Sequence, residues 1–381
     1  MLNESSSHAA IDLGRWIRTW VEIDLSALER NTRRIATHLT NRTRLIVSLK
    51  KDAYGHGLLP VARCLAARPE VAMLGLACLE EGLLLRQHGI QAPILLFSPV
   101  QGDPLEAALE QNLSLTITNL AEAQAANETA KRLDRKATVH FKLDTGMGRL
   151  GRLPGEVADQ VRQIAGLPFV RLEATYSHLA DAWDDPPSAT RQWRILQDFR
   201  AATDLQTLPQ HWGGSDALTL PIIHGSSSWI RSGIALFGDH PGLPDLEPVM
   251  TFKSRVVFRR SVPAGTPISY GSTFVTQRPT ELAVVGAGYG NGLMRSLSNC
   301  GEVLMRGIRC PMLGRVCMDQ VVVDVTDHPE IRLGEEAVLF GRQGSVVLSV
   351  AEVARKAGTI SYELFCLAGQ LNPKIVTSDP S

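Results

Sequence analysis

Short apolar runs alternate with amphipathic windows along most of the chain before residue 240. The runs predict strands at Leu45–Leu49, Val71–Ala77, Ile94–Phe97, Leu113–Ile117, Ala137–Leu143, Leu172–Tyr176, Thr219–His224 and Ile234–Phe237. The helical patterns between them include Leu58–Ala67, Glu80–His88, Ala121–Leu133 and Ala189–Thr203. Strand–helix alternation repeated about eight times predicts an α/β barrel of the (β/α)8, TIM-like kind. A doubly wound parallel sheet gives the same local pattern and stays open as the alternative.

The pattern changes near Pro248, where β-branched apolar stretches follow one another with Gly and Pro between them. Examples are Thr280–Gly290 and Gln320–Asp327, and only Val350–Ala357 has a helical pattern in this part. This texture predicts a mainly antiparallel β domain. Prolines mark the boundary, so we expect a leader over residues 1–19, a barrel over 20–247 and a β-strand domain over 248–381.

The composition argues against several classes of protein. The 381 residues contain 39 Lys and Arg and 39 Asp and Glu, and this balance does not suit a general nucleic-acid binder or a polybasic membrane-surface protein. No apolar run reaches the length that spans a bilayer, and the first residues lack the layout of a signal peptide. The six cysteines form no Cys-x-x-Cys pair, which suits a reduced cytosol and argues against a zinc site. We therefore expect a soluble, cytoplasmic protein without a metal.

The segment Leu45–Gly57, LIVSLKKDAYGHG, is the most informative in the chain. Because side chains alternate along a strand, Lys50 lies on the face opposite to Leu45 and Leu49. The apolar face packs on helices, so Lys50 should point into the barrel at its carboxyl end, where barrel enzymes place catalytic residues. An apolar pocket disfavours the charged form of a lysine and prepares the amine for Schiff-base chemistry. The alternative is a strand-end lysine that extends to solvent.

A second predicted strand ends in chemically active residues, because the same alternation along Val139–Asp144 turns His140, Lys142 and Asp144 inward. Two cations and a carboxylate at one mouth need mutual pairing. The simpler interpretation is a Lys142–Asp144 ion pair that only holds the strand end.

Two further predicted strands end near His178 and in the run His224–Ser228. Small residues with free backbone N–H groups at a late barrel strand suit a phosphate. Most such runs are only turns, so this motif by itself is weak.

Taken together, these segments resemble the alanine racemases, two-domain enzymes of fold type III that use pyridoxal 5′-phosphate (PLP). The similarity extends from Thr19–Leu25 to Ser361–Glu363, and the motifs KKDAYGHG, HFKLDTGMGRLG, SYGSTF and RVCMDQ stand in the family's order and spacing. The resemblance implies a PLP-dependent racemase with alanine as the expected substrate. It also implies a role in supplying D-alanine for cell-wall peptidoglycan.

The resemblance assigns two catalytic residues. Lys50 would hold PLP as a Schiff base and act as the base on the D side of the substrate. Tyr270 would be the base on the L side, because a racemase needs one acid–base group on each face of the planar carbanion. In the family this tyrosine reaches the active site of the partner subunit, so a head-to-tail homodimer is implied.

The resemblance also assigns binding residues. Arg231 matches the arginine that faces the pyridine nitrogen, and it would keep that nitrogen unprotonated because a guanidinium cannot give up a proton. The residues expected to bind the cofactor are Lys50, Tyr54, Arg149, His178, Ser228, Arg231, Gly233 and Ile234, of which Tyr54, Ser228, Gly233 and Ile234 match the phosphate site. The residues expected to bind the substrate are Arg149, Tyr289 and Met318 of the partner subunit. Lys142 matches a lysine that many members carry in carbamylated form.

Some positions depart from the family pattern. The segment between Ser228 and Arg231 is much shorter than usual, and Ser227 stands where an Asn is usual. Gln370 replaces a Tyr near the substrate pocket, and Trp183 replaces an acidic residue of the entry corridor. These changes bear on substrate choice rather than on reaction type, since Gln370 could hydrogen-bond a serine hydroxyl.

Three alternative functions follow from the same motifs. A serine-preferring or broad-spectrum racemase would use the same machinery. A PLP carrier without catalysis has the barrel alone, and residues 248–381 argue against it. A PLP decarboxylase of basic amino acids places an acidic residue at the pyridine nitrogen, where Arg231 stands here.

Overall fold

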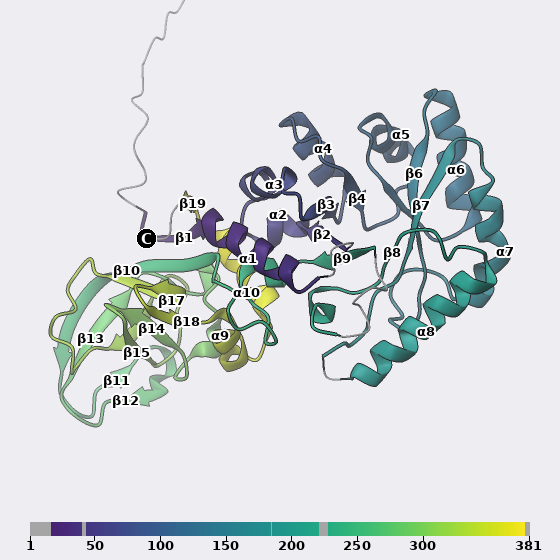
Figure 1. Cartoon of the computed structure of the whole chain (residues 1–381). Helices are drawn as coiled ribbons and strands as arrows, with labels where there is room; N and C mark the ends of the chain where they lie inside the picture. Colours follow the sequence, from purple (N-terminus) through teal and green to yellow (C-terminus); the bar gives the residue numbers. More distant parts are fainter. Residues whose placement is uncertain (1–16, 40–42, 184, 221–227, 378–381) are drawn as a thin grey trace, which may run out of the picture. The chain divides into compact units, whose positions relative to one another are not determined.

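The computed structural model describes residues 17–39, 43–183, 185–220 and 228–377. They form two compact units (Figure 1). Residues 24–249 make up the barrel unit, and the β unit combines the residues up to 23 with residues 250–376. The predicted leader over residues 1–19 lies almost entirely outside the described ranges.

Eight parallel strands close into a ring in the barrel unit. In chain order they are β2 (Arg44–Ser48), β3 (Val71–Leu76), β4 (Ile94–Leu96), β5 (Leu115–Ile117), β6 (Ala137–Lys142), β7 (Val170–Tyr176), β8 (Gln210–His211) and β9 (Trp229–Ser232). Parallel pairing joins each strand to the next from β2 through β3 to β4, and from β5 through β6 and β7 to β8. A bridge between Leu95 and Ser114 joins these two groups of strands. Strand β9 pairs with β2, and the Arg231 N–H donates to the Gly213 carbonyl oxygen beside β8 at 3.2 Å. The ring confirms the predicted barrel and excludes the doubly wound sheet.

Helices connect the strands and cover the outside of the ring (Figure 1). They are α1 (Leu25–Thr37), α3 (Leu58–Ala66), α4 (Leu79–Gln87), α5 (Asp103–Glu110), α6 (Leu120–Arg132), α7 (Pro154–Ala165) and α8 (Pro186–Ala202). The short element α2 (Lys50–Tyr54) is a left-handed turn that follows β2. Several begin at a capping side chain that satisfies a free backbone N–H group. Asp24 accepts a hydrogen bond from Ala27 N–H at the start of α1, and Asn119 accepts one from Glu122 N–H at the start of α6.

The last two strands of the barrel differ from the prediction. Ile234–Phe237 forms η4, a buried 3-10 helix, and not the predicted strand. The prediction was wrong because the hydrophobic period of so short an apolar run cannot distinguish a strand from a helix. Thr219 and Leu220 lie outside any strand, and the rest of the predicted strand Thr219–His224 falls outside the described residues. The true strands β8 and β9 contain His211 and Arg231, whose polarity hides them from a search for apolar runs.

The β unit is built on one sheet that closes on itself. The strand order is β18 (Val346–Leu348), β17 (Glu336–Gln343), β14 (Glu302–Met305), β15 (Ile308–Leu313), β16 (Val321–Asp324), β13 (Thr280–Val285), β10 (Met250–Val262), β1 (Thr19–Asp24) and β19 (Lys374–Thr377). Strand β10 pairs antiparallel with β1, β13 and β17, and the last pairing closes β10, β13, β16, β15, β14 and β17 into a ring. A short hairpin adds β11 (Pro267–Ile268) and β12 (Phe274–Val275). The predicted antiparallel β architecture is confirmed.

Two details of the β unit differ from the sequence-based expectation. Strand β1, expected in the barrel domain from residue 20 onward, pairs antiparallel with β10 instead. A second helix, α10 (Ser361–Leu371), follows α9 (Val350–Ala357), which is the one helix that the sequence predicts here. The buried side of α10 follows the i, i+3, i+4, i+7 pattern of an amphipathic helix, with Ser361, Leu364, Phe365 and Ala368 buried. Within the described ranges, no helix combines the length and the apolar character of a membrane span.

Part of the barrel interior is filled by a small apolar cluster. Ile46, Met73 and Leu95 are buried together on neighbouring strands, and Trp229 packs against them. The place of Ile46 in this cluster agrees with the alternation expected along β2. The lining of this interior therefore combines tightly packed apolar side chains with the polar residues described below.

We expect truncation of Ile46 to destabilise the barrel. Ile46→Ala removes methylene groups from a fully buried position and should lower the free energy of unfolding by about 2–5 kcal/mol, whereas Ile46→Val should cost about 0.5–1.5 kcal/mol. Urea unfolding followed by circular dichroism would measure both changes. Leu84→Ala on α4, where the side chain is 38% exposed, is the control and should cost much less. An equal loss for Ile46→Ala and Leu84→Ala would contradict this account of the core.

Candidate active site

Polar side chains gather at the carboxyl ends of the barrel strands. Lys50 follows β2, Asp144 follows β6 and His178 follows β7, and the backbone of Gly233 follows β9. Because the strands of the ring are parallel, these ends open at one mouth of the barrel. Residues far apart in the sequence can therefore act on one small molecule.

Lys50 begins a turn with an unusual backbone. Residues 51–54 all have positive φ angles, from 52° to 55°, a left-handed conformation that costs a non-glycine residue about 1–2 kcal/mol. The Asp52 carboxylate helps to hold the turn, because its Oδ1 accepts a hydrogen bond from Leu58 N–H at 2.6 Å. Such strain next to a potentially reactive side chain is typical of a functional site.

Tyr54, at the end of this turn, contacts the start of η4. The Tyr54 hydroxyl donates to Ser48 Oγ at 3.1 Å, and a Cβ atom on Gly233 would lie only 2.4 Å from Tyr54 Oη. A side chain at Gly233 would therefore displace the tyrosine. Ser215 Oγ accepts hydrogen bonds from Gly233 N–H at 2.9 Å and from Ala235 N–H at 3.4 Å. Hydroxyl and backbone N–H groups thus meet at one corner of the mouth.

Ser228 does not join this corner. Its carbonyl oxygen accepts a hydrogen bond from Arg44 N–H at the start of β2, so Ser228 lies at the amino end of β9 while Gly233 follows the carboxyl end. Ser215 stands beside Gly233 instead. The segment between the phosphate-site serine and Arg231 looks short because the resemblance assigns Ser228 as that serine. Counted from Ser215, the segment is longer by thirteen residues. The overlooked signal is the small-residue run from Gly213 to Ser215, which begins two residues after the overlooked strand β8 ends at His211.

Arg231 on β9 is a buried cation held by imidazole nitrogens and carbonyl oxygens. Its Nη1 donates to His211 Nδ1 at 2.7 Å, and its Nη2 donates to the Ser177 carbonyl oxygen at 2.7 Å and to His178 Nδ1 at 3.0 Å. The guanidinium also lies 5.4 Å from the centroid of the Tyr176 ring. Burial lowers the pKa of Arg231 to about 10, so the group stays charged at neutral pH. Sequence reasoning assigned His178 to the cofactor site but missed His211, which also accepts a hydrogen bond from Arg231.

His178 shows how much positive charge converges at this mouth. Burial is the largest cause that lowers the pKa of His178, to about 2, and four cations act in the same direction: Arg231, Arg149, Lys142 and Lys50. The imidazole is therefore neutral and can accept the hydrogen bond from Arg231. A mouth that brings together this many cations is suited to an anionic ligand.

Lys142 is buried on β6. Its Nζ donates to the Leu143 carbonyl oxygen at 2.7 Å and lies 5.3 Å from the centroid of the Tyr176 ring. Burial, followed by the nearby Arg231, lowers the pKa of Lys142 to about 7. A large share of this amine is therefore uncharged at neutral pH.

The Asp144 carboxylate shapes the loop that follows β6. Its Oδ1 accepts hydrogen bonds from Gly146 N–H and Met147 N–H, both at 2.8 Å. These donors lower the pKa of Asp144 although burial raises it. Lys142 Nζ donates to the Leu143 backbone, while Asp144 acts on it as a nearby opposite charge, so a Lys142–Asp144 ion pair alone does not hold the strand end. The loop instead carries Arg149, an exposed cation, at the mouth.

The β unit carries the other predicted site residues on adjoining loops. Tyr270, Met318 and Tyr289 are 72%, 55% and 42% exposed. Cys317 links the loops, because its carbonyl oxygen accepts from Tyr289 N–H at 3.0 Å and its Sγ lies 3.4 Å from Ser269 Oγ. Large side chains exposed side by side are typical of an interaction surface.

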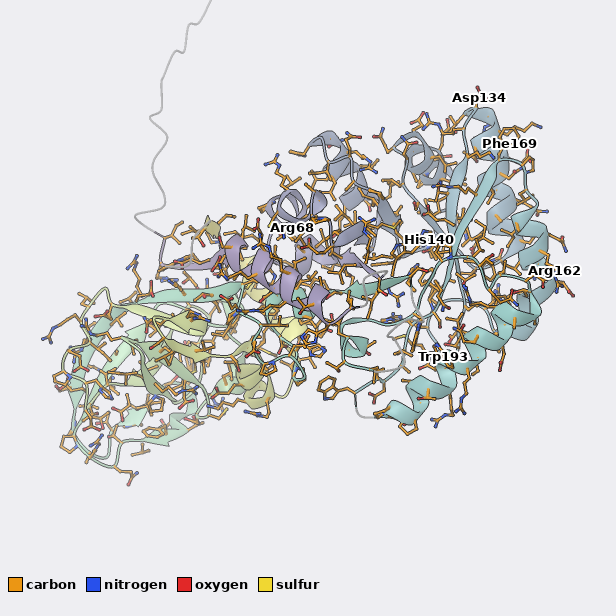
Figure 2. All side chains as sticks on the ribbon, in the orientation of Figure 1. Arg68, Asp134, His140, Arg162, Phe169 and Trp193 are labelled. Carbon is orange, nitrogen blue, oxygen red and sulfur yellow. The ribbon has the colours of Figure 1, made fainter. Side chains whose placement is uncertain are left out.

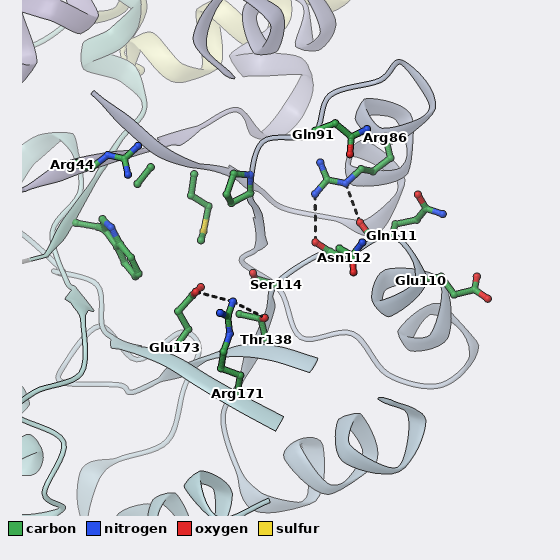
Figure 3. A pocket seen from close by; sticks show the side chains of 14 residues that line it. Arg44, Arg86, Gln91, Glu110, Gln111, Asn112, Ser114, Thr138, Arg171 and Glu173 are labelled. Atoms are coloured by element: carbon green, nitrogen blue, oxygen red, sulfur yellow. Dashed lines mark hydrogen bonds and ion pairs between the residues drawn. The ribbon is translucent and has the colours of Figure 1, made fainter. Parts of the chain in front are cut away.

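The opposite end of the barrel holds a cavity of about 540 Å³ (Figure 3). Its wall includes Arg44 and Trp229, which begin β2 and β9, so it opens at the amino ends of the strands. Arg171 in this wall donates to Thr138 and to Glu173. The cavity is therefore separate from the mouth that contains Lys50.

The carboxyl-end mouth fits a small phosphorylated carbonyl compound. Lys50 offers an amine for a covalent bond, Tyr54 and Ser215 offer hydroxyl groups, and Arg231 can face a ring nitrogen. The missing Cβ of Gly233 lets the Tyr54 hydroxyl lie directly against the Gly233 backbone, on which Ser215 also packs. These features define a barrel enzyme of the class that binds PLP at a strand-end lysine.

Comparison with known proteins identifies the family within that class. The model of the alanine racemase N-terminal domain matches residues 23–241, and the model of the C-terminal domain matches residues 249–376. The chain therefore belongs to the alanine racemase family, whose members are PLP-dependent racemases. The match to the second domain argues against the PLP carrier, which has the barrel alone.

Individual relatives and solved structures agree. The chain is 40% identical over 361 residues to the alanine racemase of Syntrophobacter fumaroxidans, covering 92% of this chain and 96% of the relative. It is 37% identical over 351 residues to that of Methylacidiphilum infernorum, covering 91% and 89%. The structure of alanine racemase from Clostridium difficile 630 superimposes with a TM-score of 0.87 at 31% identity, covering 95% and 96%. That of the Bacillus anthracis enzyme with bound L-Ala-P gives a TM-score of 0.82 at 31% identity, covering 95% of each chain.

We expect Lys142 to make stability depend on pH. The folded protein holds the pKa of Lys142 near 7, below the ordinary value of 10.5, so the unfolded chain binds this proton more tightly. Wild-type protein should therefore lose stability relative to Lys142→Met as the pH falls from about 10 to about 7, by a few kcal/mol in order of magnitude.

Urea unfolding at about pH 6 and about pH 9.5, in CO2-free buffer without added PLP, would measure this difference. Lys136→Met, at an exposed position just before β6, is the control and should show no such change. A stability difference between wild type and Lys142→Met that is the same at both pH values would contradict the buried, largely uncharged amine.

Proposed function

We propose that the protein interconverts L-alanine and D-alanine with PLP bound at Lys50. The observation that carries the proposal is the convergence of Lys50, Lys142, Arg149 and Arg231 at the carboxyl-end mouth. A phosphorylated cofactor and an amino acid carboxylate are both anions, and both would need such a mouth. When bound, PLP supplies the conjugated ring that withdraws electrons from the substrate Cα and weakens its C–H bond.

The residues of the barrel have separate tasks in this proposal. Lys50 holds the cofactor covalently through Nζ. Tyr54 and Ser215, with the backbone of Gly233 and Ile234, hold the phosphate, and their mutual contacts support this assignment. Arg231 faces the pyridine nitrogen, and its positive charge keeps that nitrogen unprotonated.

Two other residues of the mouth assist. His178 accepts a hydrogen bond from Arg231 Nη2 and so fixes the guanidinium plane. Arg149 lies on the loop after β6, where it can reach the phenolic oxygen of PLP and the substrate carboxylate.

Proton transfer needs one base on each face of the substrate. Lys50 Nζ would remove or return the proton on the D side, and Tyr270 Oη of the partner subunit would do so on the L side. The 72% exposure of Tyr270 supports a partner role, because the side chain is accessible to a second protein chain. Tyr289 and Met318 stand on adjoining loops and would complete the substrate site together with the tyrosine. The implied enzyme is a head-to-tail homodimer.

Lys142 is proposed to be carbamylated. An uncharged amine can attack CO2, forming an N–C bond and releasing a proton to water, so that a carbamate anion replaces the amine. The low pKa of Lys142, about 7, supports the step because it provides the free amine at neutral pH. The resulting anion would offset the charge of Arg149 and Arg231.

Substrate choice is the point at which the sequence departs from its family. Gln370 on α10 is exposed and could accept or donate a hydrogen bond to a hydroxyl-bearing substrate. Trp183 is 42% exposed and contacts His240 edge to face at 5.2 Å. Serine is therefore the second candidate substrate.

The cellular setting follows from the same proposal. The six cysteines, all within the described residues, are thiols and not disulfides, which is compatible with a reducing cytoplasm. D-alanine made there would serve the synthesis of cell-wall peptidoglycan.

The experiment that tests the function is chiral chromatography of the purified protein with PLP and either L-alanine or L-serine. D-alanine forming fastest supports the proposal, and D-serine forming fastest transfers it to serine. Lys50→Ala is the control, and it should lose both the visible absorbance of the bound cofactor and the activity. Absence of any D-amino acid despite bound PLP would overturn the racemase proposal.

Tyr270→Phe would test the two-base arrangement in the same assay. Because L- and D-alanine have equal free energies, kcat/KM must fall equally from both sides, so the informative readout is exchange of the α-proton with solvent deuterium. We expect the exchange to slow more from L-alanine than from D-alanine. Equal slowing from both enantiomers would contradict a one-sided role for Tyr270.

The revised phosphate corner gives a further expected outcome. Ser215→Ala removes a hydroxyl beside Gly233 and should weaken PLP binding by about 2- to 10-fold, the effect of one lost hydrogen bond. Ser228→Ala makes the same change at the other end of β9 and should leave the affinity unaltered. Titration of cofactor-stripped protein with PLP would measure both dissociation constants. A larger loss for Ser228→Ala would reinstate the sequence-based assignment.

A further inference from the structure

The geometry points to Glu173 as a positioning residue for Arg231, acting through two buried histidines that join the carboxylate to the guanidinium. The inference rests on the proposed function, because it concerns the arginine proposed to face the pyridine nitrogen of PLP.

Four side chains on four successive strands form an unbroken chain of hydrogen bonds. Arg231 Nη1 on β9 lies 2.7 Å from His211 Nδ1 on β8. His211 Nε2 lies 2.9 Å from His140 Nδ1 on β6, and His140 Nε2 lies 2.9 Å from Glu173 Oε2 on β7. His140, the third of these side chains, lies among the strands of the barrel unit (Figure 2).

The chemistry of the end groups fixes the direction of every bond. A guanidinium can only donate, so His211 Nδ1 must accept and its proton must sit on Nε2. That proton is donated to His140 Nδ1, which leaves the His140 proton on Nε2, and a carboxylate can only accept it. One tautomer of each histidine satisfies the whole relay.

The charges of the relay are confined to its two ends. Neither histidine has exposed surface, and burial lowers the pKa of both, so both rings are neutral. The hydrogen bond from His140 is the largest cause that lowers the pKa of Glu173, so its carboxylate is ionised. The buried cation Arg231 is thereby connected to an anion that it does not touch.

A local irregularity of β7 aims Glu173 at His140. The pairing of β6 with β7 passes from Val139↔Leu172 to His140↔Ala174, so Glu173 is the extra residue of a bulge. Without the bulge, alternation would send Glu173 and Tyr176 to opposite faces of the strand. With it, Glu173 reaches His140 while Tyr176 stacks on His211 at 4.5 Å.

Aromatic packing and an open end complete the arrangement. Trp229 stacks on the His140 ring at 5.7 Å, which restricts its rotation. Glu173 lies in the wall of the cavity at the amino end of the barrel, where Arg171 also donates to it at 3.0 Å (Figure 3). The anionic end of the relay is therefore the end nearer to solvent.

This separation of charge suits the reaction. A carboxylate in direct contact with the pyridine nitrogen would favour protonation of that nitrogen. A carboxylate placed three hydrogen bonds away from Arg231 helps to hold the guanidinium in one orientation without bringing an anion to the cofactor. Glu173 would thus influence the electronic state of PLP from the far end of the barrel.

Glu173→Gln tests the inference in the full-length protein, with Glu110→Gln in the same cavity wall as the matched control. Glu173→Gln keeps the shape of the side chain and removes its charge. We expect the 15N NMR signals of both His140 and His211 to change, the visible absorbance band of bound PLP to shift, and kcat to fall about tenfold or more with little change in KM. Glu173→Asp, which retains the charge, should recover part of each effect.

The outcomes separate this inference from the proposed function. Unchanged His211 signals and an unchanged PLP spectrum in a folded Glu173→Gln protein, as in Glu110→Gln, would overturn the positioning role even if the wild type is a racemase. A wild-type protein that racemises no amino acid would overturn the proposed function, while the histidine signals would still test the relay.

Discussion

Burial of the Arg231 guanidinium inside the barrel is the constraint on which the site depends. Removing such a charge from water costs several kcal/mol unless its N–H groups find acceptors. The acceptors here are imidazole nitrogens of His178 and His211 and carbonyl oxygens at the ends of β7 and β8. Strands β7, β8 and β9 must therefore end at matching heights. The ring must close for Arg231 to find its acceptors, and the hydrogen bonds from Arg231 in turn join β9 to the ends of β7 and β8.

The same constraint explains which parts of the barrel could be predicted from the sequence. Strands β2, β3 and β6 were predictable because their apolar alternation is strong, and Lys50 follows from that alternation. Strands β8 and β9 were not, because their central side chains are the polar groups that the site requires. Because β8 was missed, the sequence-based phosphate assignment includes Ser228 and not Ser215, the residue that we propose from its place beside Gly233. The apolar pattern of a strand was therefore least informative in β8 and β9, where polar residues stand at buried positions.

Long-range pairing set a second limit to prediction. Strand β1 has an ordinary strand sequence, but its partner β10 lies more than two hundred residues later in the chain. The sequence around β1 does not indicate with which strand it pairs. The bulge at Glu173 is a comparable case. It depends on the register between β6 and β7, and it reverses the face that strict alternation would assign. The family resemblance assigns Lys50 and Arg231 to the cofactor site, whereas the relay behind Arg231 could be found only from the coordinates.

The left-handed turn after Lys50 has a consequence for the order of assembly. Its four strained residues are held by contacts with later elements, since the Asp52 carboxylate binds the start of α3 and the Asp52 N–H donates to Glu81 on α4 at 3.2 Å. In a chain that has not yet docked these helices, nothing compensates the strain and the turn relaxes. The lysine amine is presented to the mouth only after this part of the barrel has formed. Under the proposed function, covalent attachment of the cofactor at Lys50 would therefore follow folding, and only a chain whose barrel has formed would carry the cofactor.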